Sequence, residues 1–534
     1  MIQVTVHRED LVRRSLVLFL TTLLAVGLLT PVAQAAGFST SYRTIPGQGG
    51  TPIRAFVVEP TGRGSGPFPL LVLPSSWGVN NIEYVGAAAK FAYESGYVVV
   101  SYTSRGFYDS GGEIDVSGPD TVADVSRVID WAIGNARGDA ARIGVAGISY
   151  GAGQALLAAA ADPRIKAVAA LSTWTDLARS LYPNETVNSQ AVEVLLAAGN
   201  LVGRPGPVLR QAEDAYRDGR FQEVVPISES RSAANKIAAI NANRTAVMIG
   251  NAWNDGIFAP GQVTDLFAKL TGPKRLMLSP GDHATAELFG AAGLPNEIWD
   301  SAGRWFDKHV RGVDNGIDRE NPVNLKPNNG GGWRTFPSWA AASAAQDTLY
   351  LAGPSWGTGA MGTTAATGWQ NRIAAGWPTV ADSGTILLSG ALQGFFGIPT
   401  GVSMPLVDRN AAAVWWGPTY TRTTAVSGAP KLHVTVTPSA PTTTLYAYLY
   451  DVGSVGLGSL VTHKPFTLRD VSPGVARTLD FELEPVLWDV PAGHQLVLVV
   501  DTVDPRYLSE SALGQSATFS SPAADPSWLR VPRG

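Results

Sequence analysis

The chain has 534 residues, 45% of them hydrophobic and 16% charged, with a formal net charge of −4. This length predicts two or three globular domains, and the composition is not that of a disordered protein. The small negative charge and the lack of Lys/Arg-rich clusters argue against a nucleic-acid partner. The chain has no cysteine, which excludes disulfides, thiol nucleophiles and zinc–thiolate sites.

The N-terminal segment has the pattern of a targeting sequence. Arg13 and Arg14 precede an apolar run over residues 16–29, and a small-residue site, AQA, follows at 33–35. We therefore expect a signal peptide over residues 1–36 and a secreted or exported protein. The run is short for a membrane span of roughly 20 residues, so stable membrane insertion is not expected, with a retained anchor as the alternative. The pattern fits both the twin-arginine and the general secretory route.

Between residues 53 and 312, short apolar runs alternate with segments of helical periodicity. Six runs are nearly continuous in apolar residues, as strands buried on both faces are: residues 67–74, 96–103, 142–147, 165–172, 245–250 and 274–280. Helical spacing is found over residues 81–95, 121–136, 152–161 and 260–270. This alternation predicts an α/β fold, with a parallel sheet covered by helices on both sides.

One interval, residues 173–243, interrupts the alternation. It has helical periodicity but no strand candidate. We predict that it forms a helical cap, inserted over one end of the sheet. Caps of this kind enclose a binding site and determine the shape of its substrate.

The pattern changes after the last helical segment. Residues 313–333 are rich in Asn, Pro and Gly and are predicted to form a linker or surface loop. From about residue 346, short β-like segments alternate with Gly, Pro and Ser, which predicts a β-sandwich or jelly roll. These segments are TILLSG, KLHVTVTP, TTLYAYLYDV, TLDFELEP and QLVLVVDT. The expected domains are an α/β domain over residues 37–340 and an all-β domain over 341–534.

Two GxSxG pentapeptides occur, around Ser149 and Ser355. This pattern marks a strained strand-to-helix turn that presents a nucleophilic serine, where small flanking residues avoid clashes across the turn. Ser149 lies between an apolar run and an alanine-rich helical segment, whereas Ser355 leads into a glycine-rich stretch that cannot form a helix. We predict that Ser149 is a nucleophile and that Ser355 lies in a loop.

A nucleophilic serine requires a base, and the base requires an acid that holds its tautomer. Of the six histidines, only His283 follows a predicted sheet strand at the end where α/β folds place active-site loops. Asp255 follows the preceding strand and is the predicted acid. It lies in an Asn-Asp-Gly sequence, so a turn or capping role is the alternative. Asp265, inside the next helix, and Asp282, beside the histidine, are less well placed.

The negatively charged oxygen formed during acyl transfer must be met by hydrogen-bond donors. The backbone N–H of Tyr150 is predicted to be one of them. Ser75 and Ser76, after the first central strand, are candidates for the second, although they are equally consistent with a turn. Trp77 and Trp253 are the candidate substrate-pocket residues, with packing as the alternative for Trp77. This chemistry requires no metal and no cofactor.

These motifs together resemble the family of X-Pro dipeptidyl-peptidases and related acyl esterases, which includes cocaine esterase-like and α-amino-acid ester hydrolases. The resemblance covers most of residues 50–525. The similar segments are SRGFYDSGG, DTVADVSRVIDWA, GISYGA, AWND, GDH, LYAYLYDVG and PAGHQLVLVV. The resemblance implies an α/β-hydrolase domain with an inserted helical cap, a C-terminal jelly-roll domain, and a catalytic triad of Ser149, Asp255 and His283.

Two positions depart from the family pattern. Ser75 stands where family members commonly have a tyrosine whose phenol donates to the oxyanion, and Ala152 replaces the second glycine after the elbow tyrosine.

The expected substrate is a small ester or a short peptide. Dipeptide release requires groups that hold a free α-ammonium, and acidic cap residues equally form a solvated face. The acidic candidates in the cap are Glu185, Glu193, Glu213 and Asp214.

An alternative from another class is an exported carbohydrate- or cell-wall-binding protein with an inactive hydrolase fold. Trp369, Trp415 and Trp416 would suit sugar stacking, although such side chains also pack between domains. An inactive fold has no reason to keep all three triad residues at the correct strand ends. The sequence therefore favours an exported serine hydrolase.

Overall fold

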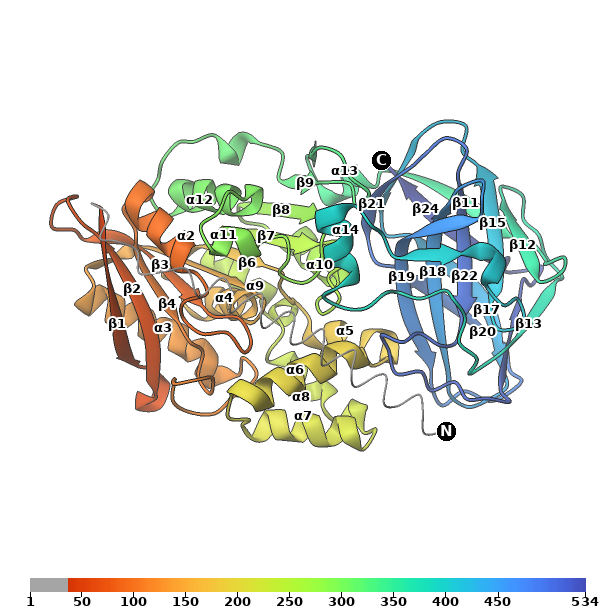
Figure 1. Ribbon diagram of the computed structural model, residues 1–534, viewed down its shortest axis with the longest axis horizontal. Helices are drawn as coiled ribbons and strands as arrows, with labels where there is room; N and C mark the ends of the chain where they lie inside the picture. The colour runs from red at the N-terminus through yellow and green to blue at the C-terminus, as the bar shows by residue number, and fades with distance from the viewer. Residues whose placement is uncertain (1–36) are drawn as a thin grey trace.

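The computed structural model describes residues 37–534, and the leader predicted for residues 1–36 lies outside them. An α/β domain and a strand-rich domain lie side by side along the long axis of the molecule (Figure 1). The predicted fold class, an α/β-hydrolase domain with a helical cap followed by an all-β domain, is confirmed. In the described part of the chain, no helix is long and apolar enough to cross a membrane.

The first domain is built on a ten-stranded sheet with the order β1-β2-β4-β3-β5-β6-β7-β8-β9-β10. The strands from β4 to β9 in that order are parallel, and the strands at both edges are antiparallel. The bounds are β1 Phe38–Pro46, β2 Pro52–Pro60, β3 Phe68–Pro74, β4 Val98–Tyr102, β5 Gly138–Ile148, β6 Ile165–Leu171, β7 Ala246–Ala252, β8 Lys274–Ser279, β9 Val323–Leu325 and β10 Arg334–Phe336. The six predicted strands correspond to β3 through β8.

Helices cover both faces of this sheet (Figure 1). Val145 of β5 faces the core that holds α3 and α4, whereas the next residue, Ala146, faces the core that holds α12. Side chains on both faces are therefore buried, which explains why the central strands are continuous apolar runs. The covering helices are α2 Val85–Lys90, α3 Pro119–Asn135, α4 Tyr150–Ala161, α10 Pro260–Lys269, α11 Leu288–Ala291 and α12 Glu297–His309.

The sheet also extends into the predicted linker over residues 313–333, which is a correction. Strand β9 adds to β8, and its residues Val323 and Leu325 are fully buried. A strand of three residues is too short to produce a recognisable pattern among the surrounding Asn, Pro and Gly. The antiparallel pair β1 and β2 was not among the predicted strands.

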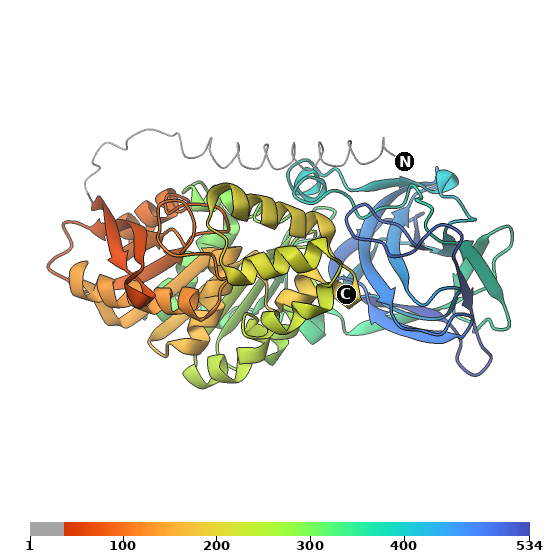
Figure 2. The same ribbon diagram turned by 90° about the horizontal axis from the view of Figure 1, so that it is seen from below.

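The interval between β6 and β7 is helical, as predicted for residues 173–243. Its helices are α5 Leu177–Leu181, α6 Ser189–Val202, α7 Pro207–Arg217, α8 Val225–Glu229 and α9 Ile237–Asn243. Figure 2 shows these helices, in yellow and yellow-green, lying across the α/β domain. They place a helical layer beside the end of β5, where Ser149 lies.

The second domain is a β-sandwich whose core holds residues from strands such as β15, β18 and β22 together with others from β17, β23 and β24. Its strands are β11 Ala345–Leu351, β12 Thr358–Gly362, β13 Gln370–Ala374, β14 Gly401–Ser403, β15 Ala413–Thr419, β16 Thr424–Gly428, β17 Lys431–Pro438, β18 Thr443–Val452, β19 Leu457–Leu468, β20 Arg477–Glu482, β21 Val486–Val490, β22 Gln495–Asp501, β23 Ser516–Ser520 and β24 Trp528–Arg533. Two short helices, α13 Trp339–Ala342 and α14 Ser389–Phe396, accompany them.

One predicted β segment, TILLSG at residues 385–390, is not a strand. It leads into helix α14, which begins at Ser389. Ile386 and Leu387 are buried in a cluster that also contains Trp174 and Ile257 of the first domain. The apolar run therefore serves the contact between the domains rather than a sheet.

The tryptophans considered for sugar stacking pack inside the sandwich. Trp415 is fully buried, and its indole N–H donates to the carbonyl of Ala352 at 3.1 Å. The indole of Trp369 donates to the carbonyl of Leu351 at 2.8 Å. Trp416 is partly buried against a second core cluster. Their apolar faces are therefore used for packing.

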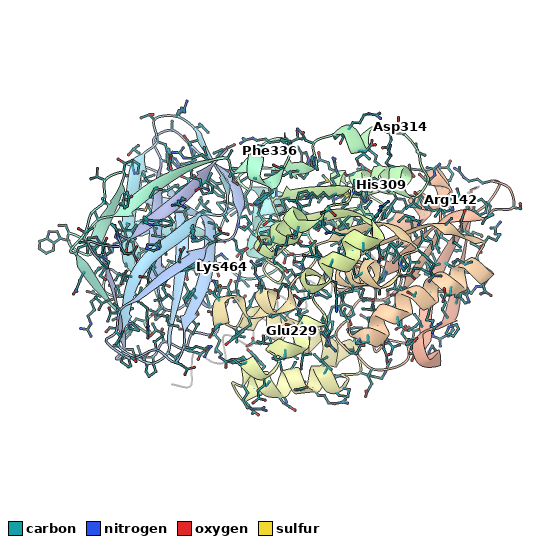
Figure 3. All side chains as sticks on the ribbon, turned by 180° about the vertical axis from the view of Figure 1, so that it is seen from behind. Arg142, Glu229, His309, Asp314, Phe336 and Lys464 are labelled. Atoms are coloured by element: carbon teal, nitrogen blue, oxygen red, sulfur yellow. The ribbon has the colours of Figure 1, made fainter. Side chains whose placement is uncertain are left out.

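The two domains are tied together by polar contacts as well as apolar ones. The backbone N–H of Gly261, at the start of α10, donates to the carboxylate of Glu484 at 2.8 Å. Lys464 of β19 pairs with the same carboxylate. Figure 3 shows Lys464 on the side of the sandwich that faces the α/β domain. The carboxylate of Glu484 thus joins a strand of one domain to a helix of the other.

Candidate active site

Ser149 occupies the turn between β5 and α4, with φ 55° and ψ −117°. L-residues rarely adopt this backbone conformation, and its cost must be met by the surrounding structure. The flanking glycines show how tight the turn is. A Cβ atom on Gly147 would lie 2.4 Å from the carbonyl carbon of Gly151, and a Cβ on Gly151 would lie 2.0 Å from the carbonyl oxygen of Pro74. The turn is therefore possible only with glycine at both positions.

Three predicted residues come together at this turn. The Nε2 atom of His283 lies 2.8 Å from Ser149 Oγ, and its Nδ1 atom lies 2.9 Å from Asp255 Oδ2. All three residues are buried. His283 follows β8 and Asp255 follows β7, so parallel neighbouring strands deliver both side chains to the same edge of the sheet. This is the geometry of a serine nucleophile, its general base and the carboxylate that orients the base.

Backbone donors fix the carboxylate of Asp255. Its Oδ1 atom accepts hydrogen bonds from the N–H groups of Ile257, at 3.0 Å, and Phe258, at 2.7 Å. Asp255 therefore both stabilises the turn that follows it and contacts His283. The ring of Phe258 packs edge-on against the imidazole at 5.0 Å. The same turn thus holds both the carboxylate and the histidine ring.

Asp282, next to His283, has a different partner set. Its carboxylate accepts from the backbone N–H of Gly256 at 2.9 Å and from that of Gly390 at 3.2 Å. Gly390 lies in α14 of the second domain, where a Cβ atom would lie 2.8 Å from the carbonyl oxygen of Gly281. Helix α14 therefore packs directly against the loop that carries the histidine. Asp282 joins the acid loop, the histidine loop and the second domain.

The second oxyanion donor does not follow the prediction. The N–H of Ser75 donates to the carbonyl of Tyr102 at 3.0 Å, and the N–H of Ser76 donates to the carboxylate of Glu83 at 2.8 Å. Both predicted backbone donors are therefore already engaged. In the described residues, the backbone N–H groups of Trp77 and Tyr150 have no hydrogen-bond partner. These two N–H groups are the candidates to meet the oxyanion.

Two buried glutamates lie close to the histidine. Burial raises the pKa of Glu287 to about 8, because its effect is larger than that of the hydrogen bond from Ser172, which lowers the pKa. Burial likewise raises the pKa of Glu83 to about 7, although Ser76 donates to it. Glu287 is therefore largely protonated at neutral pH. Asp255 is the carboxylate whose oxygens directly contact the imidazole Nδ1, at 3.0 and 2.9 Å.

Two cavities adjoin Ser149. The larger, which we name the cap cavity, has a volume of about 180 Å³ and is walled mainly by α5, α6, α7 and α8 together with Trp77, Tyr150 and Trp174. The smaller, the histidine cavity, has about 50 Å³ and is lined by Ser149, His283, Glu83 and Leu288 among others. Trp77, one of the two predicted pocket residues, lines both cavities.

Trp253, the other predicted pocket residue, lines neither cavity beside Ser149, but it lines a separate cavity together with Asp255. Its indole N–H donates to the carbonyl of Lys326 at 2.7 Å, and its ring belongs to the core beneath the sheet. Trp253 directly follows the last residue of β7, Ala252. In the described residues, no cluster of three or more histidine or acidic side chains could hold a metal ion.

The pH dependence of activity should reflect the surroundings of His283. Burial lowers the pKa of this histidine, but the charge and hydrogen bond of Asp255 outweigh that effect and leave the pKa above its ordinary value of 6.5. The base must be neutral to accept a proton, so kcat/KM should fall as the pH drops through this raised pKa. A pH profile of kcat/KM should therefore have its acidic midpoint above 6.5, and a midpoint below that value would contradict the assignment.

Two family models match the chain. One is described as X-Pro dipeptidyl-peptidase (S15 family) and matches residues 49–285, and the other is described as X-Pro dipeptidyl-peptidase C-terminal non-catalytic domain and matches residues 315–515. A Bacillus anthracis protein, described provisionally as a Xaa-Pro dipeptidyl-peptidase, is 22% identical over 470 residues, which are 81% of this chain and 73% of that protein. A Streptomyces avermitilis protein with the same description is 25% identical over 420 residues, covering 71% of this chain and 54% of its own length.

Solved structures share the whole fold. A CocE/NonD family hydrolase from Staphylococcus aureus matches with a TM-score of 0.71 and 13% identity, over 94% of this chain and 97% of its own. An α-amino acid ester hydrolase matches with a TM-score of 0.68 and 15% identity, over 95% of this chain and 98% of its own. At this level of identity the likeness concerns the fold, including the order of the α/β domain and the β-sandwich.

Proposed function

The chain belongs to the X-Pro dipeptidyl-peptidase (S15) family of serine hydrolases, and we propose that it cleaves a carboxylic ester or an X-Pro peptide bond through an acyl-enzyme on Ser149. The observation that carries this proposal is the buried chain of hydrogen bonds from Ser149 through His283 to Asp255, at 2.8 and 2.9 Å. The order Ser, Asp, His along the sequence is that of α/β-hydrolases.

The proposed reaction has two steps. In the first, Ser149 Oγ bonds to the carbonyl carbon while His283 takes the hydroxyl proton, and the bond to the leaving alcohol or amine breaks as the histidine returns that proton. In the second, water attacks the acyl-enzyme with the same base and releases the acid. The N–H groups of Tyr150 and Trp77 would stabilise the oxyanion in both steps.

Labelling with a fluorophosphonate probe tests this proposal. Such probes react with activated serine hydroxyls, so the intact protein should gain one adduct that peptide mapping places on Ser149. A protein that is not labelled and hydrolyses neither esters nor X-Pro substrates would contradict the proposal. The alternative of an inactive, sugar-binding fold predicts that second outcome.

We also propose that the protein is exported, on the basis of the apolar run and the small-residue site within residues 1–36. Expression of the full chain in an actively secreting bacterial host should release a shortened protein into the exported fraction. Mass spectrometry of its N-terminal peptide should place the new terminus next to residue 36. An intact N-terminus on a cell-associated protein would favour the retained anchor instead.

A further inference from the structure

The cap cavity has the composition of an acyl-chain site. Its walls are formed by aliphatic and aromatic side chains of the cap, among them Leu181, Leu195, Leu196, Leu209 and Val225. Ser149 is part of its lining, so an acyl group bound there would bring its carbonyl carbon close to the nucleophile. Apolar cavities of this kind favour uncharged ligands, because a charge moved into one loses its hydration without compensation.

None of the acidic cap residues faces this cavity. In the described part of the chain, its lining contains no aspartate and no glutamate. Glu185 pairs with Arg469 at 3.3 Å, Glu193 accepts from the hydroxyl of Tyr216 at 2.8 Å, and Glu213 pairs with Arg217. Asp214 is exposed on α7. Glu185 and Glu213 are thus paired with arginines, and Glu193 lies behind the hydroxyl of Tyr216, a residue that does line the cavity.

The charged residue in the cavity lining is Arg231, a cation. Its guanidinium donates to the backbone carbonyls of Asp115, at 3.1 Å, and Ile227, at 3.0 Å. The side chain is thus held by the protein itself, and its positive charge would repel the ammonium of an X-Pro peptide. Both the lack of carboxylates and the sign of this charge disfavour a dipeptidyl substrate.

The position of His283 distinguishes the two sides of the scissile bond. The histidine lines the small cavity but not the cap cavity. A leaving alkoxide must receive its proton from His283 Nε2, so the alcohol portion must lie on the histidine side of Ser149. The acyl portion then occupies the cap cavity, and water for the second step reaches the ester through the histidine cavity.

The volumes indicate sizes for the two portions. An apolar protein cavity of about 150 Å³ binds benzene, so the cap cavity of about 180 Å³ accommodates an acyl group of roughly six to eight carbons. The histidine cavity, at about 50 Å³, has room for a group the size of a few water molecules. We infer that the substrate is an ester of a medium-length, uncharged apolar acid with a small alcohol. This inference rests on the proposed function of Ser149.

Isomeric esters test this inference directly. Ethyl hexanoate and hexyl acetate have the same composition but carry the long chain on opposite sides of the ester bond. Burying a methylene group strengthens binding by about fourfold, so kcat/KM for ethyl hexanoate should exceed that for hexyl acetate by on the order of 100-fold, with butyl butanoate between them. Acid release in a pH-stat measures all three. Equal rates, or a preference for hexyl acetate, would overturn the inference.

A second comparison keeps the leaving group constant. Alanyl-proline ethyl ester releases the same ethanol as ethyl hexanoate but carries a free α-ammonium on its acyl portion. Its kcat/KM should be lower by on the order of 100-fold or more, because the ammonium has no carboxylate partner in the cap cavity. A preference for the alanyl-proline ester, with Ser149 still labelled by the fluorophosphonate, would overturn the inference alone. The absence of labelling and of all hydrolysis would overturn the proposed function instead.

A pair of variants on helix α7 locates the acyl site. Ala212 lines the cap cavity, and Ala212→Phe would fill part of it. The ratio of kcat/KM for ethyl hexanoate to that for ethyl acetate should fall by about tenfold, since the filled space excludes two or more methylene groups. Gln211→Phe adds the same side chain at the neighbouring exposed position and should keep the wild-type ratio. An unchanged ratio in a folded Ala212→Phe variant would count against the acyl site. If neither variant folds, the comparison of isomeric esters on the wild-type enzyme still tests the inference.

Discussion

Replacing Ser149 with alanine should lower kcat by about 10⁶-fold and abolish labelling by a fluorophosphonate, because the variant lacks the oxygen that forms the acyl-enzyme. The hydrogen bond of 2.8 Å from this oxygen to His283 Nε2 is lost with it. Ester hydrolysis by the purified variant measures the first effect, and intact-protein mass spectrometry measures the second. Circular dichroism should show a folded protein, since the backbone contacts of the turn remain.

Ser355→Ala is the matched control, because it removes the serine of the second GxSxG sequence. Ser355 is exposed, and its N–H donates to the carbonyl of Thr358 within a short turn. No histidine pairs with its hydroxyl in the described residues. The control should therefore retain wild-type activity and labelling. If Ser149→Ala kept more than a small fraction of the wild-type rate, the nucleophile would have to be another residue.

Asp255→Asn should lower kcat by about 10⁴-fold while Ser149 stays in place, because an amide cannot hold His283 in the tautomer that accepts the serine proton. The amide also removes the negative charge that raises the pKa of the histidine. The residual activity should then have its acidic midpoint at a lower pH than the wild type. A loss of activity caused by misfolding would not shift this midpoint, so the pH profile separates the two explanations.

Asp265→Asn is the control for this carboxylate. Asp265 lies on the exposed side of α10 and pairs with Arg179 at 2.6 Å. Exposed ion pairs contribute little to stability, so the variant should keep both the wild-type rate and the wild-type pH profile. Comparable losses in Asp265→Asn and Asp255→Asn would contradict the assignment of the acid.

The arrangement of the central sheet was predictable because both of its faces are buried. Each inner strand is then a continuous apolar run, and each connecting helix has one apolar face, so the alternation is written locally along the chain. The same reason made the grouping of the three candidate catalytic residues predictable. Parallel strands bring their carboxyl ends to one edge, and Ser149, Asp255 and His283 all follow such strands in the order that the fold requires.

Other features depended on contacts between distant segments, which leave no local pattern. The hydrogen bond from Ser76 N–H to Glu83 removes a predicted oxyanion donor, and only the folded turn shows that Trp77 N–H is left without a partner. Strand β9 was missed because three residues carry too little periodicity. The apolar run at 385–388 was assigned to the wrong element because burial against another domain and burial in a sheet select the same residue types.

The substrate side of the site shows the same division. Acidic residues of the cap could be counted in the sequence, but the direction of each carboxylate follows from the packing of α6 and α7 and from partners such as Tyr216 and Arg469. The apolar cap cavity is likewise formed by helices that meet only in the folded chain. The sequence therefore determined the fold class and the candidate catalytic residues, since strand patterns and motif order are local. The tertiary structure determined which side chains line the cavities beside Ser149.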